Sequence, residues 1–147
     1  EAFRIVERID PDKFEISYLS YRKEPKDWYR VDRFYNRIAP EKVGEVYANC
    51  DILIKTSIVE SFSYPPLEMM ATGGVSVVVP NGGNVEYLKD DYNCLFYRQG
   101  DIDAGVAAVE KLLNDKKLRD KIIKNGQKTA QAYQWSKLEQ RIVDIYK

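Results

Sequence analysis

The sequence Glu60-Ser-Phe-Ser-Tyr-Pro-Pro-Leu-Glu68 lies between two short apolar runs at positions 51–57 and 75–79. Both runs are rich in β-branched residues and end in turn formers, which is typical of buried strands in a parallel sheet. The two consecutive prolines suit the first turn of a helix, and the glycine pair at 73–74 suits its end. The stretch therefore predicts a strand, a loop, a helix and a second strand. Open α/β sheets bind ligands at the edge where such a loop lies.

Strand and helix patterns alternate along the rest of the chain. The predicted strands are 14–20, 31–38, 51–57, 75–79 and 94–97, and the predicted helices are 1–9, 40–48, 64–73, 84–88, 101–114, 118–133 and 136–147. This alternation predicts an α/β fold, namely a Rossmann-like, parallel, doubly wound sheet completed by C-terminal helices. A chain of 147 residues suits one such domain, spanning residues 1–147.

Composition narrows the classes of function. The chain has 23 lysine and arginine residues and 23 aspartate and glutamate residues, so its formal net charge is zero. This balance gives no reason to expect nucleic acid as a partner. The chain has no histidine, and its two cysteines, Cys50 and Cys94, suit small buried residues of a reduced protein. No apolar run reaches the ~20 residues that a membrane span needs. We therefore expect a cytoplasmic protein, with peripheral contact at the inner membrane face as an option for the full-length form.

The central stretch resembles the second-domain signature of retaining GT-B glycosyltransferases, the nucleotide-sugar-dependent group 1 (family 4-like) enzymes. That signature is Glu, seven residues, Glu and then Ala-Met-Ala-x-Gly, and Glu60 and Glu68 fall on its two acids. Three further motifs are similar to the family's Gly-Gly-x-x-Glu, Asn-Gly-Leu and Gly-Asp: Gly82-Gly83-Asn84-Val85-Glu86, Asn93-Cys94-Leu95 and Gly100-Asp101. The resemblance covers residues 35–147. The chain departs from the family pattern where Ser61, Ser63 and Cys94 replace glycines and Val75 replaces a proline.

The resemblance implies a nucleotide-sugar-binding domain. The full-length protein would bind a nucleoside-diphosphate sugar and transfer the sugar, with retention, to a glycan or lipid-linked acceptor held by an N-terminal domain outside this sequence. Polysaccharide or glycan synthesis is the implied role, and no metal or other cofactor is implied. The cations that neutralise the diphosphate in this family follow the domain's first strand. We expect them upstream of residue 1, so the domain would be truncated at its N-terminal side and inactive alone.

The missing first strand has a consequence for the sheet. Doubly wound folds commonly order their strands 3-2-1-4-5-6, with the first strand in the centre. The strand at 14–20 would then be the second, and the strand at 51–57 the fourth. We therefore expect a gap between these two strands, which a strand outside this sequence fills.

Each of the two acids has a structural and a functional interpretation. Glu68 lies in the first turns of the predicted helix, where the dipole favours any acid by ~0.3–1 kcal/mol. A carboxylate there could also accept two hydrogen bonds from vicinal ribose hydroxyls, which is the role that the resemblance implies. Glu60 lies in the loop, either as a solvated carboxylate or, as the resemblance implies, as a catalytic group beside the donor sugar. A carboxylate stabilises an oxocarbenium-like transition state electrostatically.

The remaining predicted donor-binding residues lie in two loops. The backbone at Ser61, Phe62 and Ser63 leads into the N-terminus of the predicted helix, which suits a diphosphate. For the Ser63 side chain, we favour an ordinary helix N-cap. Gly82 and Gly83 lie at the same sheet edge, where we expect a turn with positive φ and amides that contact phosphate or sugar.

Asp101-Ile-Asp103 matches the Asp-x-Asp that holds a metal in a different glycosyltransferase fold. Here it opens a predicted helix, so a cap and a favourable dipole contact explain it better, and Ser136 is the predicted cap of the last helix. Two other classes of function stay open. One is a nucleotide-sugar epimerase of the same architecture, against which the absence of histidine argues, and the other is a non-catalytic docking domain.

Overall fold

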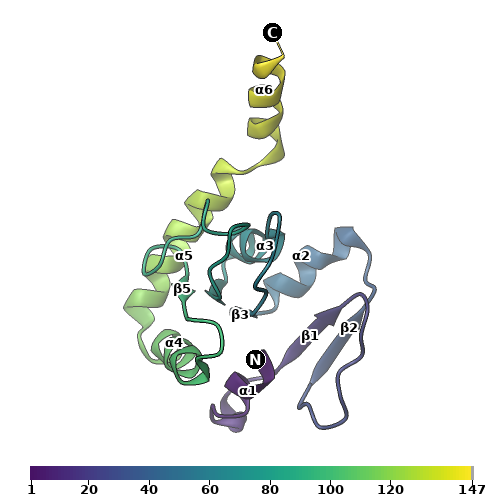
Figure 1. Cartoon of the computed structure of the whole chain (residues 1–147), viewed down its shortest axis with the longest axis vertical. Helices are drawn as coiled ribbons and strands as arrows, with labels where there is room; N and C mark the ends of the chain where they lie inside the picture. Colours follow the sequence, from purple (N-terminus) through teal and green to yellow (C-terminus); the bar gives the residue numbers. More distant parts are fainter. Residues whose placement is uncertain (147) are drawn as a thin grey trace.

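The computed structural model describes residues 1–146, in which strands and helices alternate along the chain (Figure 1). The strands are β1 (Ser17–Ser20), β2 (Arg33–Asn36), β3 (Ile52–Lys55), β4 (Val75–Val78) and β5 (Leu95–Phe96). The helices are α1 (Ala2–Val6), the 3-10 turn η1 (Pro11–Lys13), α2 (Pro40–Ala48), α3 (Tyr64–Thr72), α4 (Ile102–Asn114), α5 (Lys116–Ala132) and α6 (Trp135–Ile145). The predicted α/β class is confirmed.

All strand pairs are parallel, and they form two sheets, β1-β2 and β3-β4-β5. Within residues 1–146 no strand pair joins the two sheets, so a direct ladder between residues 14–20 and 51–57 is excluded. The neighbours in each sheet are those expected for strands 2-3 and 4-5-6 of a doubly wound fold. A further strand between β1 and β3 remains a prediction.

The core lies on both faces of β4, whose residues are all buried. Val75 and Val77 belong to a cluster with apolar residues of α1, α4 and α5, whereas Val78 belongs to a second cluster with Leu67 and Met70 of α3. Successive side chains of a strand point to opposite faces of the sheet, which explains this division. Helices on both faces leave the carboxyl ends of β3 and β4 to be covered by loops.

Several predicted boundaries were wrong. The predicted helix at 84–88 is a series of turns over residues 82–87. The backbone makes two separated i−4 hydrogen bonds, from the Val85 amide to the Asn81 carbonyl (3.2 Å) and from the Leu88 amide to the Asn84 carbonyl (2.9 Å), rather than the consecutive bonds of a helix. The Asn84 side chain ties this turn to the residues just after β4, because its amide nitrogen donates to the Val79 carbonyl (3.0 Å) and its Oδ1 accepts from the Asn81 amide (2.9 Å). The strand predicted at 94–97 is reduced to β5, because Cys94 forms only a single bridge with Asp90.

The ends of the helices also differ from the predictions. The first helix, predicted over 1–9, ends at Val6. After it the backbone hydrogen bonds join residues three apart, as in a 3-10 turn, and the Arg8 amide donates to the Ile5 carbonyl at 3.2 Å. The last helix begins at Trp135, so Ser136 lies inside it and is not its cap. In Figure 1, α6 extends beyond the end of α5, away from the sheets.

Two predictions about single residues were confirmed. The Asp101 carboxylate accepts a hydrogen bond from the Ala104 amide at 2.9 Å, as expected for the cap of α4, and Asp103 pairs with Arg8 at 2.5 Å. Cys94 is buried, and burial raises the pKa of its thiol to about 12. Cys50 is half-buried, and both cysteines are free thiols.

Across residues 1–146, none of the helices combines the length and apolar character needed to cross a bilayer.

Candidate functional site

The loops after β3 and β4 are joined directly at the carboxyl edge of the sheet. The side-chain amide of Asn81 donates to the Ser57 carbonyl at 2.8 Å, and the Ser63 amide donates to the Gly83 carbonyl at 3.0 Å. The Tyr87 hydroxyl donates to the Ser63 carbonyl. Residues 57–63 and 79–87 therefore form one unit, which we call the donor-loop pair. It contains every predicted site residue except Glu68.

Gly83 allows the two loops to come into contact. A Cβ atom at this position would lie 2.2 Å from the Glu60 carbonyl oxygen and 2.8 Å from the Glu60 Cβ, whereas at Gly82 it would meet no atom within 4 Å. Neither glycine has a positive φ; Gly73 and Gly100 do. The prediction of a positive-φ turn at Gly82 and Gly83 was therefore wrong, and close approach of the two backbones is the reason for a glycine at position 83.

Glu60 forms an ion pair with Lys55 at the end of β3. Lys55 Nζ lies 2.5 Å from Glu60 Oε1 and 2.5 Å from Ser57 Oγ. The Lys55 and Glu60 side chains are only 18% and 26% exposed. The hydrogen bond from Lys55, with a smaller contribution from Ser57, holds the pKa of the Glu60 carboxyl below its usual value. Glu60 is thus an oriented anion at the loop mouth.

Glu68, unlike Glu60, has a carboxylate that is not held by another described side chain. It lies in α3 and is half-buried, and among the side chains that the structure describes its carboxylate has no hydrogen-bond or ion-pair partner. Burial raises its pKa, and its charge in turn helps to raise the pKa of Tyr47 on α2. A half-buried carboxylate without a partner retains its full capacity to accept hydrogen bonds from a ligand.

The predicted capping bond of Ser63 is absent. Ser63 occupies the N-cap position of α3, but its hydroxyl makes no capping hydrogen bond, and its Oγ is buried without any partner. An N-cap side chain accepts from the amides of the second or third helical residue. Here those residues are Pro65 and Pro66, which have no N–H. The side-chain role predicted for Ser63 was therefore wrong.

The other predicted residues of the donor-loop pair differ in which backbone amides stay free to bind a ligand. The Phe62 side chain packs against Tyr87 and Tyr133, with ring centroids 5.3 and 6.1 Å from theirs, and is partly buried. Among the described residues, the amides of Ser61, Phe62 and Gly82 have no acceptor, whereas the Gly83 amide donates to Asn81 Oδ1 at 2.9 Å. Free amides thus remain in both loops.

Sequence reasoning missed Lys55 and Asn81. Lys55 is a charged residue at the end of an otherwise apolar strand, five positions before Glu60, and that was the available signal. The bond that Asn81 accepts from the Gly83 amide is local, two residues away, whereas its bond to the Ser57 carbonyl depends on how the two loops pack together and had no signal in the sequence.

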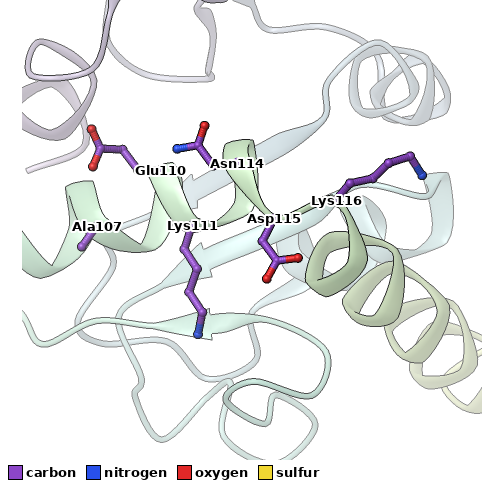
Figure 2. A pocket seen from close by; sticks show the side chains of 6 residues that line it. All are labelled: Ala107, Glu110, Lys111, Asn114, Asp115 and Lys116. Carbon is purple, nitrogen blue, oxygen red and sulfur yellow. The ribbon is translucent and has the colours of Figure 1, made fainter.

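Figure 2 shows a groove outside this site, lined by α4 and the start of α5. Its residues are Ala107, Glu110, Lys111, Asn114, Asp115 and Lys116. Three of its charges already have partners: Lys111 pairs with Asp91, Asp115 accepts from the Leu118 amide and Lys116 pairs with Asp120. The groove contains none of the predicted site residues.

No group of three or more Cys, Asp or Glu side chains suited to a metal ion occurs in the part of the chain that the structure describes.

The sequence matches the family described as glycosyl transferases group 1 over residues 18–129, and the chain belongs to this family. An uncharacterized glycosyltransferase of Methanocaldococcus jannaschii is 27% identical over 78% of the chain. N,N'-diacetylbacillosaminyl-diphospho-undecaprenol alpha-1,3-N-acetylgalactosaminyltransferase of Campylobacter jejuni is 31% identical over 74% of the chain. The chain spans only 30% and 29% of the lengths of these two relatives.

Solved structures show the same fold. Anabaena HepE superposes with a TM-score of 0.72 at 24% identity, over 80% of this chain and 32% of that protein. The C-terminal domain of LpcC, a group 1 glycosyl transferase of Francisella tularensis, gives a TM-score of 0.62 at 26% identity, over 71% of this chain and 54% of that one. The predicted fold is confirmed: the chain has the Rossmann-like fold of the C-terminal domain of GT-B glycosyltransferases.

Proposed function

We propose that the full-length protein transfers a sugar from a nucleoside-diphosphate donor to an acceptor, and that this chain supplies the donor site. The observation that supports this most directly is Glu68, a half-buried carboxylate without a partner among the described residues. Leaving such a group unpaired costs stability unless a ligand uses it. Two hydroxyls of a ribose match its two oxygens.

The donor-loop pair fits the rest of the donor. Free amides at Ser61, Phe62 and Gly82 could donate to a diphosphate, and the oriented anion Glu60 could contact the sugar. Anabaena HepE, which shares the fold, was solved with UDP and with UDP-glucose, so uridine nucleotides are the first donors to test.

The acceptor and the stereochemistry belong to the same proposal. The Campylobacter jejuni relative is named for transfer to a lipid-linked diphosphate sugar, which makes a glycan or lipid-linked acceptor a reasonable class. We propose retention of configuration, transfer without a bound metal, a cytoplasmic location and a role in polysaccharide or glycan synthesis. We expect residues 1–147 alone to be inactive, because the chain matches only 30% and 29% of the lengths of the two relatives.

Calorimetric titration of the full-length protein with UDP tests the donor site. Glu68→Ala should weaken binding by about 1.5–3 kcal/mol, roughly 10–100-fold, because charged hydrogen bonds are lost. Glu110→Ala, which removes an exposed acid of α4, is the matched control and should bind like the wild type. Equal affinities in the wild type and Glu68→Ala would remove Glu68 from the site. If no nucleoside diphosphate binds at millimolar concentration, a docking domain becomes the better interpretation.

Steady-state kinetics separates the two acids. Glu60→Ala should lower kcat more than it raises the donor KM, because its contact strengthens in the transition state. Glu68→Ala should act mainly on donor binding. Wild-type kinetics in Glu60→Ala would exclude a catalytic role for that carboxylate.

A further inference from the structure

Lys55 is an unusual residue for its position. It ends β3, whose other residues Ile52, Leu53 and Ile54 are apolar, and its register partner is the fully buried Val78. A lysine in such a place must keep its ammonium group solvated or paired. Here the ammonium group bonds to Glu60 and Ser57.

The Lys55–Glu60 ion pair differs from the others in the structure. Its side chains are 18% and 26% exposed, whereas those of the other ion pairs between described residues are 33–81% exposed. Exposed pairs contribute little to stability, and desolvation offsets much of the attraction in less exposed ones. Stability alone therefore explains poorly why a lysine stands here.

We propose that Lys55 is a positioning residue for Glu60, holding its carboxylate in the donor-loop pair in the orientation and charge state that contact with the donor sugar requires. This inference rests on the proposed function. The Glu60 backbone is held separately by its close contact with Gly83. Lys55 adds the constraint on the side chain, so that the backbone and the carboxylate are both fixed before a ligand arrives.

The groups around Glu60 support the assignment. Lys55 and Ser57 bond to it from β3 and the loop that follows, and Tyr87, in the loop after β4, is close enough for the Glu60 charge to contribute to its raised pKa. Burial raises the pKa of Tyr87, so its phenol stays neutral at ordinary pH. Lys55 is thus the charged neighbour that acts on Glu60. Because Lys55 lowers the pKa of Glu60, its removal should make the carboxylate protonate at higher pH.

A titration that needs no activity gives the first test. In the full-length protein with 13C-labelled glutamate, the Glu60 carboxyl signal is assigned by its loss in Glu60→Gln. Its titration midpoint should move to higher pH in Lys55→Met, stay near the wild-type value in Lys55→Arg and be unchanged in Lys116→Met. Lys116 is the matched control, because it forms an exposed ion pair with Asp120. An unshifted midpoint in Lys55→Met would overturn the proposal.

Turnover gives the second test. Lys55→Met should lower kcat on the order of 10–100-fold, as expected for a misplaced catalytic group, with a smaller change in the donor KM. The acidic limb of its pH profile should move to higher pH, and Lys55→Arg should restore most of the activity. Equal losses in both variants with an unmoved profile would indicate a packing role and overturn the proposal. If Lys55→Met does not fold, Ser57→Ala replaces it and should shift the Glu60 midpoint in the same direction.

The two proposals fail in different ways. If the wild type turns over donor and the Glu60 midpoint does not move in Lys55→Met, only the role of Lys55 is overturned. If the wild type neither binds UDP nor transfers sugar from any nucleoside-diphosphate donor, both proposals fail, even when Lys55→Met shifts the Glu60 titration.

Discussion

Gly83 lies so close to Glu60 that a Cβ atom added to it would sit 2.2 Å from the Glu60 carbonyl oxygen. The contact joins two loops that follow neighbouring strands of one sheet, and a hydrogen bond from the Ser63 amide to the Gly83 carbonyl accompanies it. The backbone position of the proposed catalytic acid therefore depends on a residue more than twenty positions away.

Gly83→Ala should destabilise the full-length protein by about 1–3 kcal/mol, because the clash is with backbone atoms that cannot move aside cheaply. It should also weaken donor binding, since Glu60 would be displaced. Gly82→Ala is the matched control, because a Cβ there meets nothing within 4 Å. Thermal unfolding and UDP titration of both variants check this. Indistinguishable melting temperatures and affinities in the two variants would contradict it.

Ser63→Ala should leave the stability of the donor-free protein unchanged or raise it by about 1 kcal/mol, because it removes a buried hydroxyl without a partner. Asp101→Ala should instead cost about 1 kcal/mol, because Asp101 caps α4 through the Ala104 amide. Denaturant unfolding measures the free energy of unfolding of both variants. It thereby compares an N-cap residue without a capping hydrogen bond, Ser63, with one that makes such a bond, Asp101. A loss in Ser63→Ala as large as that in Asp101→Ala would show that the Ser63 hydroxyl does cap its helix.

Arg37 has a φ of 50°, in the left-handed region that L-residues other than glycine rarely adopt. Its side chain donates to the Tyr21 carbonyl at 3.4 Å, a long hydrogen bond. Arg37→Ala removes that bond but keeps the strain, whereas Arg37→Gly removes both. The glycine variant should therefore be about 1–2 kcal/mol more stable than the alanine variant in thermal unfolding. Equal stability would mean that the backbone relaxes out of this conformation.

Glu68 should make stability depend on pH. Burial raises its pKa in the folded protein above that of the unfolded chain, so the folded state binds the proton more tightly. The ionised carboxylate therefore costs stability at neutral pH, and the cost disappears as the pH falls through the folded pKa. Glu68→Gln should be more stable than the wild type at pH 7, and the two should converge in acid. Unfolding curves across pH measure this difference, and a constant gap at every pH would argue against it.

Local sequence patterns predicted the strand, loop, helix and strand around Glu60 and Glu68, since side-chain periodicity, turn formers and helix breakers act over a few residues. The resemblance of this stretch to the family's signature, with Glu60 and Glu68 on its two acids, indicated the family that the comparisons then confirmed. The same local rules failed at residues 84–88, where the backbone makes two separated i−4 hydrogen bonds, Val85 to Asn81 and Leu88 to Asn84, in place of the consecutive bonds of a helix.

The sequence by itself determined the α/β class, the parallel strands, the cap at Asp101 and which segments form the loops at the carboxyl edge. Only the tertiary structure decided that Lys55 holds Glu60, that Gly83 is required by backbone contact and that the Ser63 hydroxyl is left without a partner. The reason is physical. Periodicity and capping depend on neighbours along the chain, whereas these contacts depend on how two loops pack across adjacent strands, where a shift of one ångström exchanges a hydrogen bond for a clash.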